Sequence, residues 1–148
     1  MSATWLRVLE HIHGHLGWLS VAALIHPAVL LRHRARRAVL SCVLAAFMSS
    51  VTLLLGAVIY PSYRSQLKRG LFLDHPSIGW WFERKEHLAL GVIAFAWVGF
   101  LSHLAAPKLT PEQRPLAERL AHRAFVMAAA LSVVVAATGV VAAVTAPF

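Results

Sequence analysis

The sequence YPSYRSQLKRGLFLDHPSIGWWFERKEH, from Tyr60 to His87, joins two long apolar runs and decides how the chain folds. It holds eight of the chain's twenty Lys, Arg, Asp and Glu residues, together with both tyrosines and the adjacent Trp80 and Trp81. Aromatic rings and long cationic side chains settle at a membrane–water interface, where the apolar part contacts lipid and the polar tip stays in water. We therefore expect residues 61–86, punctuated by proline and glycine, to form an interfacial loop between two membrane-spanning helices.

The composition of the whole chain predicts a membrane protein. Of its 148 residues 59% are hydrophobic, and the mean hydropathy is +0.67, above the usual level of soluble domains. A helix needs roughly 20 residues to cross the hydrocarbon core of a bilayer. Four runs are long enough, and short connections between them make neighbouring helices antiparallel. The prediction is an all-α polytopic membrane protein, a single domain built as a four-transmembrane-helix up-down bundle, with spans at 12–31, 38–60, 87–106 and 125–146.

Basic residues set the expected orientation of these spans. The connection from Arg32 to Arg37, RHRARR, has four arginines and no acidic residue, and short basic loops stay in the cytoplasm. Both termini and residues 61–86 are then expected outside the cytoplasm. The protein itself is expected in a plasma (inner) membrane. The net charge of +8 reflects this topology, with binding of anionic lipid as a second cause. No nucleic-acid motif accompanies the charge, so nucleic acid is not an expected partner.

The sequence lacks the motifs of common soluble enzymes. It has no phosphate-binding glycine loop, no GxSxG elbow and no HExxH zinc motif. Its one cysteine, Cys42, lies inside the second run, so no CxxC pair and no covalent haem-attachment motif exists. Ordinary hydrolase and nucleotide chemistry are not expected.

Histidine is the unusual feature of the composition, with nine residues that mostly lie on the apolar runs or at their ends. His11, His15 and His26 share one helical face, because spacings of 4 and 11 residues correspond to rotations of about 40° and 20°. His87 and His103 are 16 residues apart on the third run, which matches in depth the 15 residues between His11 and His26. One or two haem b groups held by pairs of histidines would fit this layout. The candidate haem ligands are His11, His15, His26, His87, His103 and His122, with the iron held chiefly through His15, His26, His87 and His103.

In general plan, the four runs and these histidines resemble the four-helix membrane b-type cytochromes and the haem-bearing membrane anchors of quinone oxidoreductases. The resemblance implies electron transfer with quinone or a partner redox protein. The chain would then be a quinone-linked oxidoreductase or a subunit of one, within a larger complex or a homo-oligomer. It also implies that basic residues of the interfacial stretch meet haem propionates or a quinone carbonyl, namely Arg64, Lys68, Arg84 and Lys85.

Three further residues of this stretch complete the expected site. Glu83 lies one turn before His87 and is expected to orient its imidazole as a hydrogen-bond acceptor. Arg84 is expected to grip a carboxylate with its two-pronged guanidinium. Tyr60 is counted with them as a supporting residue at the start of the stretch.

Stripes of small residues run along the second and fourth spans. Such stripes let helix backbones approach closely, and a flat cofactor between helices needs the same narrow walls. The pattern therefore permits either tight packing or a cofactor. The residues are Ala45, Ser49, Thr52 and Gly56 on the second span, and Ala129, Ser132, Ala136, Gly139 and Ala143 on the fourth.

Other functions are compatible with the histidines, and proton transfer along His and Glu groups or lipid binding is one, because intramembrane ionisable residues serve both. Imidazole is comfortable at a membrane interface, so the chain can be a non-catalytic scaffold or accessory subunit, and His33 and His75 are assigned to loops on that basis. Alternatively, the HIHGH segment at 11–15 is a copper or zinc ligand cluster of a histidine-rich metal-binding protein. On a continuous helix, however, His13 turns about 200° from His11, so convergence would require an extended N-terminus.

Overall fold

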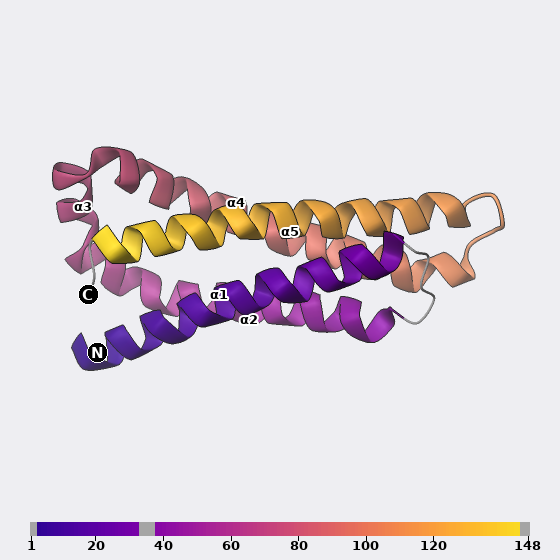
Figure 1. Ribbon diagram of the computed structural model, residues 1–148, viewed down its shortest axis with the longest axis horizontal. Helices are drawn as coiled ribbons and strands as arrows, with labels where there is room; N and C mark the ends of the chain where they lie inside the picture. The colour runs from indigo at the N-terminus through magenta and orange to yellow at the C-terminus, as the bar shows by residue number, and fades with distance from the viewer. Residues whose placement is uncertain (1–2, 33–37, 146–148) are drawn as a thin grey trace.

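The computed structural model describes residues 3–32 and 38–145, and within these ranges the chain is all-helical. The predicted cytoplasmic loop at 33–37, including His33, lies outside the described residues. The start of the first helix and the end of the last helix lie at the same end of the molecule as the short helix α3 (Figure 1). In chain order the elements are α1 (Ala3–Arg32), α2 (Val39–Gln66), α3 (Lys68–Asp74), α4 (Pro76–Ala105), the 3-10 turn η1 (Ala106–Lys108) and α5 (Arg114–Thr145).

Four of these helices, α1, α2, α4 and α5, are long and apolar enough to cross a membrane. Each keeps large apolar side chains exposed, for example Trp18, Leu54, Val98 and Val141. An apolar outer surface suits lipid, and helices satisfy their backbone hydrogen bonds internally. The all-α prediction is confirmed, as is the presence of four helices of spanning length. Their insertion and orientation stay predictions.

The long helices form a bundle in which α1 packs against α2 and α5, and α4 packs against α5 and α2. Helices α1 and α4 therefore occupy diagonal corners, as short connections between antiparallel neighbours require. The core is built mainly of small residues, so the helices approach closely. Its fully buried members include Leu24 of α1, Cys42 of α2, Ala96 of α4 and Phe125 of α5. Cys42 thus has the buried position of a small apolar residue.

Residues 61–86 are helical over nearly their whole length, which differs from the predicted loop. Helix α2 continues through Pro61 to Gln66, α3 follows after one residue, and α4 begins at Pro76. A proline at the first helical position is favourable, because the amide it lacks would have no acceptor within the helix. The charged and aromatic residues of this stretch therefore lie on definite helix faces.

Contacts between α2, α3 and α4 close this end of the bundle. Lys68 Nζ lies 2.9 Å from Glu83 Oε2, and the rings of Tyr63 and Phe82 stack with centroids 4.2 Å apart. The ring of Phe72 lies so close to Gly79 that a Cβ there would be 2.9 Å from Phe72 Cδ2. These contacts hold α3 against the start of α4.

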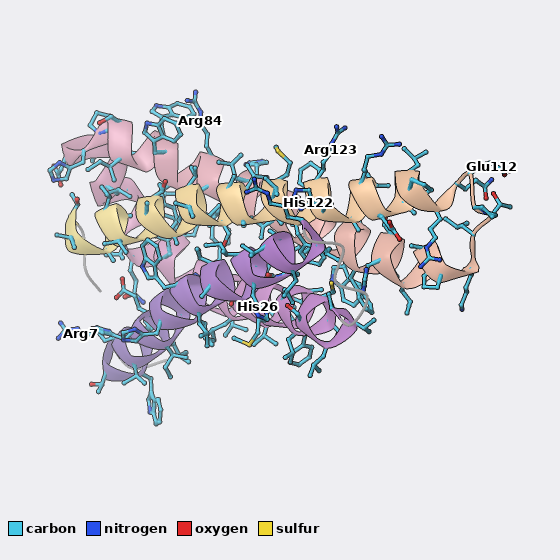
Figure 2. All side chains as sticks on the ribbon, turned by 45° about the vertical axis from the view of Figure 1, so that its right-hand side comes forward. Arg7, His26, Arg84, Glu112, His122 and Arg123 are labelled. Atoms are coloured by element: carbon cyan, nitrogen blue, oxygen red, sulfur yellow. The ribbon has the colours of Figure 1, made fainter. Side chains whose placement is uncertain are left out.

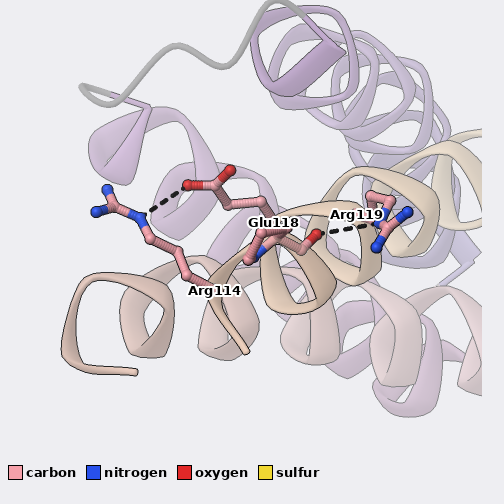
Figure 3. A network of polar contacts seen from close by, with 4 residues as sticks. Arg114, Glu118 and Arg119 are labelled. Atoms are coloured by element: carbon pink, nitrogen blue, oxygen red, sulfur yellow. Dashed lines mark hydrogen bonds and ion pairs between the residues drawn. The ribbon is translucent and has the colours of Figure 1, made fainter. Parts of the chain in front are cut away.

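The opposite end is formed by the hairpin between α4 and α5, which reaches beyond the neighbouring ends of α1 and α2 (Figure 1). Polar contacts stabilise the first turns of α5 (Figure 3). Arg114 Nε lies 3.1 Å from Glu118 Oε1, and Arg119 Nε donates to the carbonyl of Pro115 at 3.2 Å.

Candidate functional site

A cavity of about 470 Å³ lies between the four long helices, in the half of the bundle that carries α3. This volume falls in the range of about 300–1,000 Å³ that is typical of small-molecule sites. The small-residue stripes of α2 and α5 form much of its wall. These stripes therefore border a cavity, in addition to letting the helices pack closely. Those wall residues are Ser49, Thr52 and Gly56 of α2, and Ser132, Ala136, Gly139 and Ala143 of α5.

Polar side chains gather in the part of the cavity that is nearest to α3. They come from three helices, and on α4 the lining positions follow the spacing of a single helix face. If imidazole is counted as neutral, one lysine and two glutamates give this group a formal charge of −1. The members of this group are Glu10 and His13 of α1, Tyr60 and Tyr63 of α2, and Lys85 and Glu86 of α4.

Two buried atoms of this lining have no hydrogen-bond partner among the described residues. They are Nδ1 of His13 and the hydroxyl oxygen of Tyr63. Nearly all buried polar groups in proteins are hydrogen-bonded, and an unpaired one costs about 1–3 kcal/mol. A polar atom placed in the cavity would therefore gain most at these two positions.

His13 reaches the cavity because α1 is helical through the HIHGH segment. Its ring lies against Gly56, where a Cβ would be 2.9 Å from His13 Cε1. Next to this contact, Ser20 Oγ lies 2.8 Å from Thr52 Oγ1, which ties α1 to α2. The predicted divergence of His13 from His11 is confirmed. The sequence prediction did not include that this direction points into the bundle. A signal was present, because His13, Gly17, Ser20 and Leu24 form a helical stripe.

The structure places the six predicted haem ligands outside the lining of this cavity. His11, His15, His26 and His87 are exposed, so the α1 face that was expected to carry haem ligands does not point into the cavity. His103 is buried in the half of α4 that is far from α3.

Hydrogen bonds occupy one ring nitrogen of several of these histidines. His26 Nδ1 lies 2.8 Å from Ser41 Oγ, and His122 Nδ1 lies 3.0 Å from the carbonyl oxygen of Ala28, so His122 links α5 to α1 (Figure 2). Among the residues described, no three or more His, Cys, Asp or Glu side chains cluster as metal ligands. Among the described residues, His13 alone supplies an imidazole to the cavity, so the described lining does not offer a haem two histidine ligands.

The residues predicted to support a cofactor divide into two groups. Lys85 and Tyr60 line the cavity together with Glu86, and their supporting role stays a prediction. Arg64 and Arg84 are exposed. Arg84 extends away from the bundle, and its guanidinium lies 6.0 Å from the ring centroid of Trp81, within the range of a cation–π contact (Figure 2).

The expected role of Glu83 is corrected by its contacts. Its carboxylate forms the 2.9 Å ion pair with Lys68 and does not orient the imidazole of His87. His87 Nδ1 instead lies 3.1 Å from the backbone carbonyl oxygen of Glu83. Glu83 and Lys68 therefore connect α3 to α4, outside the lining of the cavity.

No protein-family model, curated protein or solved structure matches this chain. The fold and the site define it as a bundle of four helices of membrane-spanning length with an internal cavity that is polar near α3.

Proposed function

We propose that this protein binds a quinone-type molecule in the membrane, in the cavity between α1, α2, α4 and α5, and takes part in electron transfer. One observation carries the proposal: His13 Nδ1 and the Tyr63 hydroxyl are buried without a partner among the described residues, and both residues line the same cavity. A quinone ring presents oxygen atoms to such groups. Its apolar tail suits the small, largely apolar walls that α2 and α5 provide.

The charges of the polar lining favour a neutral head group. Lys85 is accompanied by Glu10 and Glu86, so a phosphate or carboxylate would meet two negative charges for each positive one. A neutral head group needs hydrogen-bond donors and acceptors instead. The lysine and the tyrosine hydroxyl donate, a carboxylate accepts, and an imidazole does either according to its protonation.

Titratable groups beside the cavity give this site the means to move protons. A bound quinone supplies two-electron, two-proton redox chemistry. Intramembrane ionisable residues commonly mark proton or substrate paths, and His13, Lys85 and Glu86 are three such residues on two helices that line one space. Their part is to hold, donate or accept a proton next to the head group.

The b-type haem predicted from the histidine pattern is the second candidate, and in this cavity it depends on His13. Imidazole nitrogen is a usual ligand of haem iron, and His13 is the histidine that the described cavity lining contains. A second axial ligand would have to come from outside the cavity lining. A partner protein or a second copy of the chain could supply it.

Binding of a short-tailed quinone to the purified full-length chain in mild detergent tests the proposal. We expect saturable quenching of tryptophan fluorescence, no Soret band, and an affinity lowered about tenfold by His13→Ala. His26→Ala is the matched control, because His26 is on the same helix but outside the lining of the cavity. Absence of saturable binding, or equal affinity of wild type and His13→Ala, would overturn the proposal. A Soret band that is lost in His13→Ala would support haem instead, and a colourless protein without quinone binding would favour the scaffold function.

A further inference from the structure

The outer face of α1 carries two histidines near the start of the helix. His11 and His15 are both exposed and line one shallow surface groove. Residues four apart on a helix are neighbours, with Cβ atoms about 5–6 Å from each other. His13 lies between them in sequence but lines the cavity. The helix therefore divides the HIHGH segment into an outward pair and an inward single residue.

Hydrogen bonding prepares His11 to act as a ligand. Its Nδ1 lies 2.7 Å from the backbone carbonyl oxygen of Arg7. A carbonyl only accepts, so Nδ1 carries the proton and Nε2 keeps its lone pair. Metal-ligating histidines almost always have this arrangement, in which the other ring nitrogen donates to a carbonyl or carboxylate. The spacing of the pair is also that of the two zinc ligands on an HExxH helix.

We propose that His11 and His15 bind one divalent transition-metal ion on the outer face of α1. Two imidazoles favour Cu²⁺, Ni²⁺ and Zn²⁺, and Cu²⁺ is expected to bind most tightly. No third His, Cys, Asp or Glu converges with the pair in the described part of the chain, so water completes the coordination. The nearby Arg7, which lines the same groove, adds a positive charge that weakens the site. An exchangeable ion of moderate affinity follows from both features.

Electron paramagnetic resonance of bound Cu²⁺ tests this site directly. Tag-free full-length protein, stripped with EDTA and titrated with Cu²⁺ in detergent, is expected to bind one ion with two nitrogen ligands. His11→Ala and His15→Ala should each remove one nitrogen and weaken binding at least tenfold. His26→Ala is the control, because this exposed histidine of α1 has no histidine one turn away.

Three results would overturn the proposal. They are the absence of stoichiometric copper binding, unchanged binding in both pair variants, and loss of a nitrogen ligand in His13→Ala, which would mean that HIHGH gathers as one non-helical cluster. None of these results bears on quinone binding in the cavity, which is measured separately.

Discussion

Replacing Tyr63 with phenylalanine is expected to change stability and ligand affinity in opposite senses. Tyr63 is 4% exposed, its hydroxyl is buried without a partner among the described residues, and its ring stacks on Phe82. Phenylalanine keeps the ring and the stacking but removes the hydroxyl. Because an unpaired buried polar group costs about 1–3 kcal/mol, the ligand-free variant should be at least about 1 kcal/mol more stable. In a protein of this size 1 kcal/mol raises Tm by roughly 2–4 °C.

With a quinone bound, the same hydroxyl is expected to form a hydrogen bond. Such a bond contributes about 0.5–1.5 kcal/mol net, so Tyr63→Phe should weaken binding roughly twofold to tenfold. Thermal unfolding in detergent, without and with a short-tailed quinone, measures both effects on one sample.

Tyr60→Phe is the matched control for this pair of measurements. Tyr60 lines the same cavity, but its side chain is partly exposed and its hydroxyl is not among the buried unpaired atoms. Little gain in stability is therefore expected from its loss. A Tyr63→Phe protein that is less stable than wild type without ligand, or that binds quinone more tightly, would refute the reasoning.

Two further predictions concern packing and topology. Gly99→Ala should lower Tm, because its Cβ would lie 2.8 Å from ring carbons of the fully buried Phe125 and overpacking costs about 1–3 kcal/mol. Gly139→Ala should raise Tm, since nothing lies within 4 Å of a Cβ built at Gly139 and alanine favours the helix by up to about 1 kcal/mol. Thermal unfolding measures both variants. Shifts of Tm with the same sign in the two would contradict this packing. A cysteine introduced at 62–75 should label with an impermeant reagent added from outside, whereas one at 33–37 should not, and reversed labelling would invert the expected orientation.

Run length and hydropathy were sufficient to predict the four long helices, because crossing a bilayer imposes a minimum apolar length. The same criteria failed at residues 61–86, where polar composition and proline suggested a loop. Pro61 lies within α2, and Pro76 occupies the first turn of α4. Packing explains the helical conformation there: Leu71 of α3 is almost fully buried, and Phe82 stacks on Tyr63. Those contacts connect segments that no local pattern brings together.

The lining of the cavity was predictable only in part, because a helical pattern shows which residues share a face but not which face is buried. In water the apolar face would be the buried one. In a membrane, lipid is as apolar as the core, so this criterion fails. The face of α1 with His11 and His15 was preferred for its histidines, yet the face with His13 and Ser20 is the one that lines the cavity. On α4, Lys85 was predicted to support a cofactor; it lines the cavity, and that role stays a prediction.

The number of histidines therefore does not show which of them face the cavity. Helical geometry turns His11 and His15 outward and His13 inward, so three residues of one short segment do not form one site. By contrast, His13 and Tyr63 stand on different helices and come from sequence positions that suggest no relation. Each has a buried polar atom without a partner in the described structure, and both line the same cavity. Since leaving both atoms unpaired costs stability, the proposed ligand would gain most by satisfying them together.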